Sequence, residues 1–306
     1  MGKVSVQEIK ELMTATGVGM MDCKRALVAA DGDQDKAIEA LREKGLATQA
    51  KKSGRAAAEG VVAAVVQGNT GVLLEVNTET DFAANTDDFK AFVASVAKTI
   101  IEKNPADVDA LKASTISGGD KTVDEVLTEL AGMKIRENIV IRRFVRLEGT
   151  IASYVHNGGS IGVLVKMDTD IKDDAVLTVG KDVAMQSAAL NPAYLKRDEV
   201  PAEVLDKEKE IMMAQMAEDP KMASKPEQVR AKIVEGKVGK YYTENCLLEQ
   251  AFVKDDKLSV KGYVDAEAKK LGGTIKVTDV IRYERGEGIE KKEDNLADEV
   301  ANMIKK

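Results

Sequence analysis

The feature that most constrains the fold of this chain is an internal repeat of a strand–turn–strand pattern. Residues 59–66 (EGVVAAVV) resemble residues 148–155 (EGTIASYV) at an offset of 89. Residues 71–74 (GVLL) resemble residues 162–165 (GVLV) at an offset of 91. Turns rich in Gly and Asn separate the two strands of each copy, as in β-hairpins. The chain therefore contains two related antiparallel hairpins.

Each hairpin is followed by a segment with helical spacing of its apolar residues, over about 88–101 and about 181–190. An antiparallel sheet commonly buries one face against helices. Two further apolar runs, at residues 139–147 and 274–281, predict additional strands. We therefore predict an α+β fold with a core of two related antiparallel-sheet-plus-helix subdomains.

The first 54 residues are predicted to form a separate N-terminal domain of three short helices. A capping box at residues 5–8 (SVQE) begins the first helix. Apolar spacing predicts a second helix over about 20–30 and a third over about 34–44, with Gly45 as the cap that ends it. The run at 49–55 (QAKKSGR) is polar and basic, and we interpret it as a linker.

The remaining chain divides by its apolar and proline patterns. The first core subdomain is predicted over 55–143, and the second over 144–190 and 239–284. Four of the five prolines bracket two helical stretches, which predicts an antiparallel helical hairpin inserted at 191–238. Its narrow apolar stripe favours a hairpin that projects from the body. Residues 285–306 are predicted as a C-terminal module that ends in an amphipathic helix.

Charge and cysteine content limit the partners and the compartment. The chain has 45 Lys and Arg against 52 Asp and Glu, and a net charge of −7 argues against broad attraction to nucleic acid. No run approaches the roughly 18 apolar residues of a membrane span, and the N-terminus lacks an apolar signal core. Two isolated cysteines are typical of a reducing compartment. We expect a cytoplasmic protein that binds no membrane and no nucleic acid.

Two motifs resemble catalytic signatures, and neither fits. Residues 158–162 (GGSIG) match a nucleophile elbow, but strand patterns flank them on both sides, and the one histidine, His156, precedes the serine. Residues 118–122 (GGDKT) lack the glycine that a phosphate loop has directly before its lysine. One histidine and two distant cysteines do not make a usual zinc spacing. We expect no enzyme activity, no metal, no cofactor and no direct nucleotide binding.

The polar cluster at 77–85 (NTETDFAAN) contains one of five phenylalanines in a chain without tryptophan. Such clusters are typical of turns. Phe82 is therefore either folded back over its own sheet or exposed as a wedge for a partner. Burying a phenylalanine in a partner is worth roughly 1.5–3 kcal/mol. Asp81 is a candidate N-cap for a short helix, and His156 is by itself an ordinary hairpin-turn residue.

Met20 and Met21 follow a glycine-rich turn between the first two predicted helices. They either fill the core of the small helical domain or offer adaptable apolar contacts to a partner. Neighbouring helical residues point about 100° apart, so burial of both is less favoured than burial of one.

Four segments together resemble bacterial elongation factor Ts. Residues 14–27 (TATGVGMMDCKRAL) are similar to its N-terminal signature, and residues 75–83 (EVNTETDFA) to its Thr-Asp-Phe signature. Residues 135–139 (IRENI) and 286–291 (GEGIEK) resemble further family segments. The matches extend from the first predicted helix to the C-terminal region, in the family's order.

This resemblance implies a guanine nucleotide exchange factor that binds elongation factor Tu in its GDP-bound and nucleotide-free states. It implies an N-terminal domain of ubiquitin-associated type, a coiled coil for the inserted hairpin, and contact of both terminal modules with the GTPase. In the family, an Asp-Phe pair enters the GTPase domain near its magnesium and phosphate site and so releases GDP.

Carried over residue by residue, the Asp-Phe pair is Asp81 and Phe82. Ile135 matches a contacting segment, in which Arg136 stands where the family usually has glycine. His156 matches a partner-contacting histidine of the second hairpin. The partner-binding residues expected for elongation factor Tu are therefore Thr80, Asp81, Phe82, Ala83, Ile135, His156, Met20 and Met21.

Two rival functions remain open from the residues alone. Arg142, Arg143, Arg146 and the basic run at 49–55 favour an RNA-binding module of the translation apparatus, although aromatic residues are not interleaved with them. A metabolic enzyme would use carboxylates such as that of Asp81 and would need a catalytic pocket.

Overall fold

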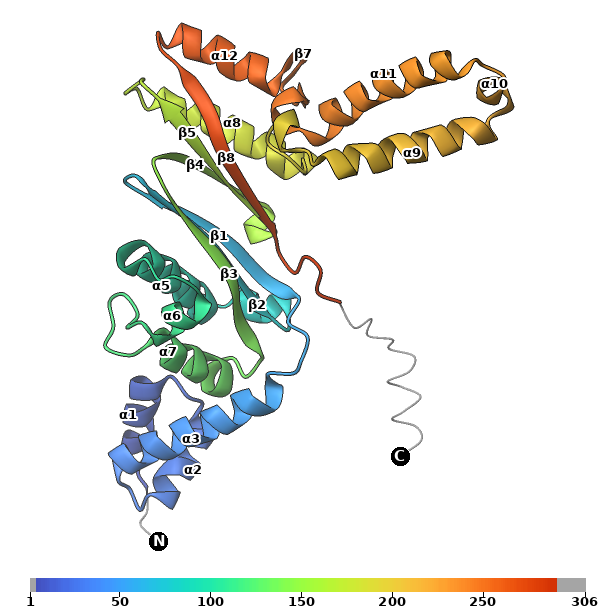
Figure 1. Cartoon of the computed structure of the whole chain (residues 1–306). Coiled ribbons are helices and arrows are strands. Elements are labelled where there is room, and N and C mark those ends of the chain that lie inside the picture. The colour runs from blue at the N-terminus through green and yellow to red at the C-terminus, as the bar shows by residue number, and fades with distance from the viewer. Residues whose placement is uncertain (1–3, 291–306) are drawn as a thin grey trace.

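A computed structural model describes residues 4–290 of the chain. It is elongated, with the N-terminal helices at one end, antiparallel sheets in the middle and a long helical hairpin projecting from the other end (Figure 1). Helices and antiparallel strands form separate segments, so the predicted α+β class is confirmed. The predicted C-terminal amphipathic helix, with Leu296 to Ile304, lies outside the described residues.

The N-terminal unit consists of α1 (Val6–Thr16), α2 (Met20–Ala29) and α3 (Gln34–Lys52). The capping box of Ser5 and Glu8 begins α1, as predicted. The prediction that the third helix ends near Lys44 is wrong. Gly45 lies inside α3, and the helix continues through most of the run interpreted as a linker. Gly45 is buried against the core rather than capping the helix, and packing supports the helix there despite its low propensity.

The first sheet has the order β1-β2-β3, all antiparallel. Helices cover its outer face, and their apolar residues join the buried residues of β2 in one cluster. The Thr122–Glu125 capping box begins the last of these helices. The elements are β1 (Glu59–Gln67), β2 (Thr70–Thr78), α4 (Asp81–Ala84), α5 (Asp87–Lys103), α6 (Val108–Ala113), α7 (Val123–Glu129), the π-helical turn η1 (Leu130–Lys134) and β3 (Ile139–Glu148).

The second sheet repeats this arrangement with the order β4-β5-β8. Its main helix, α8, begins six residues before the predicted position 181, because the segment after β5 is already helical from Ala175. The elements are β4 (Thr150–His156), the 3-10 turn η2 (Asn157–Gly159), β5 (Ile161–Thr169), α8 (Ala175–Leu190), β6 (Ala251–Phe252), β7 (Asp255–Ser259), α12 (Val260–Lys270) and β8 (Ile275–Glu284).

The two sheets pack against each other through an apolar seam of Val62, Leu73, Ile151 and Leu164. A side chain on Gly71 would run into Ile151, and one on Gly162 would run into Val62 and Leu73. These two glycines are equivalent in the internal repeat, so the repeat preserves close sheet–sheet contact. Helices cover β2 on one face and the second sheet covers the other, which buries every residue of the strand.

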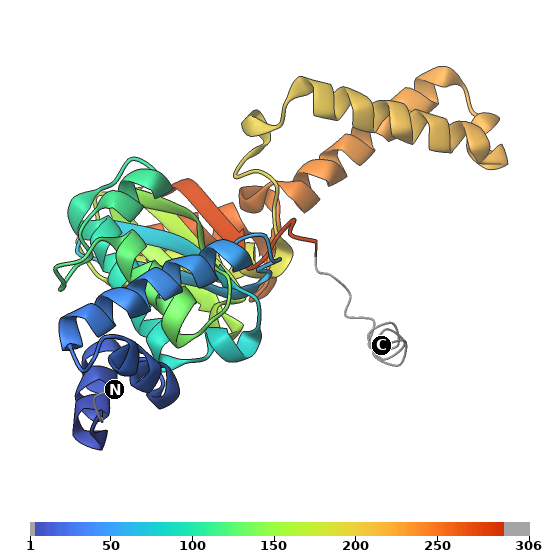
Figure 2. The ribbon, with the colours of Figure 1, turned by 90° about the horizontal axis from the view of Figure 1, so that it is seen from below.

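The inserted hairpin is formed by α9 (Ala202–Glu218), the short helix α10 (Pro220–Ala223) and α11 (Glu227–Asn245). It projects beyond the sheets in both views (Figures 1 and 2). Met216 and Val234 are the only buried residues of these three helices. The second long helix passes the predicted boundary at 238, because its end is tied to the body by pairing of Tyr194 with Cys246. Short 3-10 turns, Arg197–Glu199 and Leu247–Glu249, flank the hairpin.

Candidate functional site

The strand β2 ends in a short exposed turn that carries Phe82. Its hydroxyl-bearing N-cap is Thr80, which accepts a hydrogen bond from the Ala83 amide (3.2 Å). The prediction that Asp81 is the N-cap is therefore wrong, because Asp81 is the first helical residue. Ala83 is buried under the turn, whereas Phe82 is 84% exposed. The alternative in which Phe82 folds back over its own sheet is thus excluded.

Glu137 holds the base of this turn from the neighbouring loop. One carboxylate oxygen accepts hydrogen bonds from the Thr78 hydroxyl and the Thr80 amide, both at 3.0 Å. The other accepts one from the Thr80 hydroxyl at 2.8 Å. Charge-assisted hydrogen bonds of this kind are stronger than neutral ones. The turn is therefore held in one geometry although its aromatic side chain is free.

Glu79 connects the same two segments in the opposite direction. Its carboxylate accepts a hydrogen bond from the Asn138 amide at 2.6 Å and lies 3.3 Å from the Arg55 guanidinium. The Asn138 side chain in turn donates to the Arg55 carbonyl at 2.7 Å. The predicted contact segments at 80–83 and 135–139 are thus neighbours in space.

The two residues before Glu137 differ in what they offer a partner. Ile135 is half-buried and packs against the core of the first sheet, so only part of its side chain is accessible. Arg136 has a φ of 63°, a left-handed conformation that glycine adopts most easily. Its guanidinium pairs with Asp22 of α2, which joins this loop to the N-terminal unit.

Asp22 is buried in a cluster of three cations. Hydrogen bonds from Lys44 and then Arg25, together with Arg136, hold the pKa of the Asp22 carboxyl far below its usual range.

The two residues before Asp22, Met20 and Met21, are 51% and 60% exposed. Neither methionine fills the helical core, so the alternative of two core methionines is excluded.

His156 ends β4 and is exposed beside the turn η2. Its Nδ1 lies 3.0 Å from the Tyr154 hydroxyl. The Ser160 hydroxyl donates to the His156 carbonyl at 3.2 Å instead of approaching the imidazole, and strands flank the motif on both sides. This geometry is not that of a nucleophile elbow. Both η2 and the Phe82 turn contact β1, so His156 and Phe82 belong to turns packed on the same strand.

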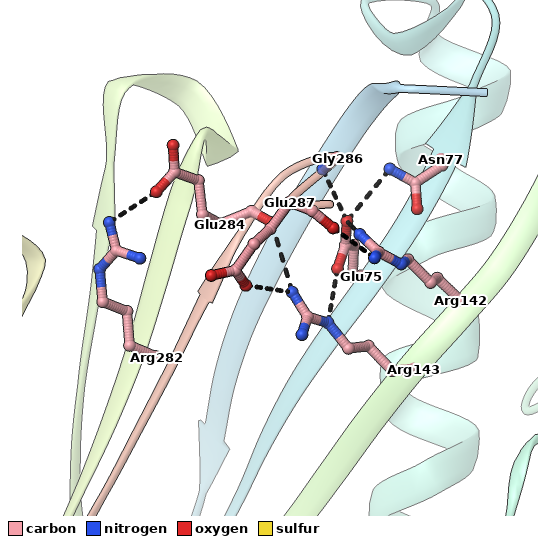
Figure 3. Close-up of polar contacts among 8 residues, drawn as sticks. All are labelled: Glu75, Asn77, Arg142, Arg143, Arg282, Glu284, Gly286 and Glu287. Carbon is pink, nitrogen blue, oxygen red and sulfur yellow. Dashed lines mark hydrogen bonds and ion pairs between the residues drawn. The ribbon is translucent and has the colours of Figure 1, made fainter. Parts of the chain in front are cut away.

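A buried carboxylate, Glu75 of β2, fixes the segment that follows β8 (Figure 3). It accepts hydrogen bonds from Arg142 (3.0 Å), Arg143 (2.7 Å) and the Gly286 amide (2.8 Å). Burial acts to raise the pKa of the Glu75 carboxyl, but the Gly286 amide and the two arginines outweigh it, so the pKa is lowered. Arg143 also pairs with Glu287 at 3.1 Å. The C-terminal segment is therefore tied to the first sheet.

The basic residues that favoured RNA binding are mostly engaged within the protein. Besides the two arginines that hold Glu75, Arg146 pairs with Glu148 at 2.7 Å. In the basic run, Lys52 donates to the Arg136 carbonyl and Arg55 pairs with Glu79. Neutralised arginines attract phosphates weakly, because the nearby carboxylate cancels their field. These pairs count against the RNA-binding alternative.

Over residues 4–290, no group of three or more His, Cys, Asp or Glu side chains is placed to hold a metal ion. Within the same range, no helix is long and apolar enough to cross a membrane. What the site offers is a locked turn with an exposed aromatic ring, and a second apolar surface at the N-terminal helices. The fold and the site thus define a protein that acts by binding another protein.

Comparisons with known proteins agree with this class. A family model described as Elongation factor TS matches residues 79–287. A relative named Elongation factor Ts from Clostridium kluyveri is 48% identical over 98% of this chain and 99% of its own length. The one from Syntrophotalea carbinolica is 47% identical over 99% and 100%. The chain belongs to the elongation factor Ts family, as its segments predicted. Membership implies a nucleotide exchange factor for elongation factor Tu rather than an enzyme.

Sequence reasoning did not find the carboxylates that hold the site. Glu137 follows Arg136, and Asp22 stands two residues before Lys24, so each acid has an ordinary basic neighbour and no local pattern that marks its long-range role. Glu75 had one usable signal, since it interrupts an apolar strand that is otherwise buried. An acidic residue inside such a strand must be paired, because burying it alone is very costly.

Proposed function

We propose that the turn Thr80–Ala83 enters the GTPase domain of elongation factor Tu and promotes GDP release by disturbing its magnesium and phosphate environment. The observation that carries this proposal is the 84% exposure of Phe82 on a turn that Glu137 holds rigidly. A locked turn loses little conformational freedom on binding, so most of the burial energy of the ring is available to deform the partner. Asp81, beside it, brings a negative charge toward the phosphate site.

The energies involved are sufficient for a binding protein without catalytic groups. Linkage is reciprocal, so a factor that weakens GDP binding is itself bound more weakly when GDP is present, by the same ratio. A hundredfold effect corresponds to about 2.7 kcal/mol. Burial of one phenylalanine contributes roughly 1.5–3 kcal/mol. Binding to both the GDP-bound and the nucleotide-free partner follows from this cycle.

The remaining predicted contacts extend this surface. In the proposal, Met20 and Met21 bind the GTPase domain from an N-terminal domain of ubiquitin-associated type, and His156 adds a polar contact. Ile135 contributes through its exposed part. The hairpin of α9 and α11 is proposed to be a coiled coil, and residues 285–306 to be a module that packs on the partner. A cytoplasmic location follows from the role in protein synthesis.

The test is the release of a fluorescent GDP analogue from elongation factor Tu, with excess unlabelled nucleotide, in the presence and absence of this protein. We expect the release rate to rise with protein concentration and to saturate. An unchanged rate at saturating protein would overturn the proposal. A salt titration with RNA in place of the GTPase checks the alternative, for which tight, steeply salt-dependent binding is the expected sign.

A further inference from the structure

The C-terminal half of α3 lies along the first core subdomain as well as closing the three-helix unit. The contacts come from positions spaced by three and four residues, so they share one face of the helix. They join Arg42 to Glu129 (3.3 Å), Gly45 to Gly132, Gln49 to Thr128 (2.7 Å) and Lys52 to the Arg136 carbonyl.

Two glycines, Gly45 of α3 and Gly132 of η1, lie against each other in this contact. A side chain on Gly132 would overlap the backbone of Gly45, and one on Gly45 would press on Met133. Met133 itself is buried in the apolar cluster of the N-terminal helices, although it belongs to η1 of the core. Side chains and backbone thus interlock across the boundary, so the N-terminal unit is docked on the core rather than held by a flexible linker.

Two consecutive residues after η1 then reach in opposite directions. The Arg136 guanidinium pairs with Asp22, which directly follows Met20 and Met21 on α2. The Glu137 carboxylate holds Thr80, two residues before Phe82. One peptide unit therefore connects the methionine surface to the phenylalanine turn.

We propose that Arg136 and Glu137 form a bridge that fixes the spacing of the two surfaces that bind the GTPase, with Arg136 acting as a positioning residue for nucleotide exchange. This inference rests on the proposed function. Two contacts to one partner reinforce each other only when their spacing matches it, because each then raises the effective concentration of the other. Arg136 touches neither the nucleotide nor the ring, and acts through the orientation of α2.

The experiment pairs a distance measurement on the free protein with the GDP-release assay. Spin labels are placed at exposed positions by Lys24→Cys and Lys90→Cys. The native Cys23 and Cys246 are buried and their pKa values are raised by burial, so they react poorly. Arg136→Gly removes the guanidinium while glycine keeps the left-handed backbone at no cost.

For Arg136→Gly we expect a broader label-to-label distance distribution and at least a threefold higher half-saturating concentration, with the maximal release rate within twofold of wild type. Gly132→Ala should broaden the distribution further. The matched control is Arg197→Gly, which breaks the comparable pair with Glu249 near the hairpin and should change neither quantity.

Three outcomes would overturn the inference. An unchanged distance distribution in Arg136→Gly means that the pair does not fix the spacing. A broadened distribution with an unchanged half-saturating concentration means that exchange does not need the spacing. A lower maximal rate with an unchanged distribution means that Arg136 contacts the partner directly. If the wild-type protein does not accelerate GDP release from the GTPase, the proposed function fails. The distance data then still decide whether the bridge exists.

Discussion

The turns that follow β2 and β5 are equivalent in the internal repeat, yet only the first carries an exposed aromatic residue. Both turns use a carboxylate to hold the strand that completes the sheet. Glu79 accepts a hydrogen bond from the Asn138 amide directly before β3, and Asp170 accepts one from the Thr274 amide directly before β8, each at 2.6 Å. The two acids are 91 residues apart, the offset of the repeat.

The difference lies in what was added to this shared scaffold. Residues 79–86 separate β2 from α5, whereas the shorter segment 170–174 separates β5 from α8. The longer segment forms the extra helical turn with Phe82. The second copy is instead extended after α8, by the helical hairpin. The two copies thus share a scaffold and differ in the loops that connect its elements.

The largest expected effect is a loss of stability that distinguishes the two copies of the repeat, for a substitution next to a β-bulge. Both copies have a bulge at the same repeat position. The extra residue is Arg142 of β3, opposite Glu75 and Val76 of β2, and Thr278 of β8, opposite Lys166 and Met167 of β5. Replacing the buried carboxylate by Glu75→Gln should destabilise the fold by roughly 3 kcal/mol at pH 7, because Arg142 and Arg143 lose their charge partner. Denaturant unfolding measures this loss, with Lys166→Gln as the control that should change little.

We also expect the effect of Glu75→Gln on the free energy of unfolding to depend on pH. Because the folded-state pKa of Glu75 lies below its ordinary value of 4.5, its contribution is present above that value and disappears as the pH falls through the folded-state pKa. The stability difference between wild type and Glu75→Gln should therefore shrink below about pH 4.5. A difference that stays constant down to pH 3 would contradict the role of the charge.

The next effect concerns the aromatic side chain itself. Phe82→Ala should slow stimulated GDP release about tenfold or more, since roughly 1.5–3 kcal/mol of burial in the partner is lost. Its thermal midpoint should stay within a few degrees of wild type, because the ring is exposed. The matched control is Leu177→Ala, an exposed residue in the first turn of α8 after the second hairpin. Equal effects of both substitutions would remove the distinction between the copies.

Removing Glu137, the carboxylate that clamps the Phe82 turn, should slow GDP release less than removing the ring. Glu137→Ala leaves the hydrogen bonds of Thr80 unmet and should weaken the turn by about 1–2 kcal/mol, with a several-fold slower release of GDP. Because Glu137 acts through Phe82, the double variant with Phe82→Ala should be little slower than Phe82→Ala alone. Fully additive losses would show an independent role, and Asp170→Ala should leave exchange unchanged.

The smallest effect is expected for the addition to the second copy. Replacing residues 206–240 with a short Gly-Ser linker should leave the thermal midpoint of the two-sheet core within a few degrees. The hairpin helices bury only Met216 and Val234 over the described residues, so few apolar contacts are lost. A scanning calorimetry trace without a cooperative transition would mean that the insertion supports the core.

The sequence predicted the elements with strong local signals. Both hairpins and the predicted capping box of Ser5 and Glu8 are present, because turn glycines and N-cap hydroxyls act within a few residues. Gly45 misled the prediction, since a glycine at a helix end and a glycine at a close helix contact look alike in sequence. The contact with Gly132 is 87 residues away in the chain and leaves no local pattern.

The candidate site was predicted in part for the same reason. The scarce Phe82 in a polar turn marked the position, but its exposure depends on the burial of its neighbour Ala83 and on the clamp from Glu137. Pairings such as that of Asp22 with Arg136 depend on how two units pack. Local spacing carries no information on such long-range ion pairs.

The burial of β2 on both faces has a mechanical consequence. A strand that is enclosed along its whole length opens only when the domain unfolds, so its amide hydrogens should exchange among the slowest in the chain. Phe82 lies in the short helix that follows this rigid strand. When the two proteins bind, we therefore expect the GTPase to change conformation around the ring, while β2 keeps its shape. In hydrogen exchange of the complex, we expect unchanged protection of the β2 amides and increased exchange around the nucleotide site of the partner. Faster exchange of the β2 amides would instead show that this protein, and not the GTPase, deforms on binding.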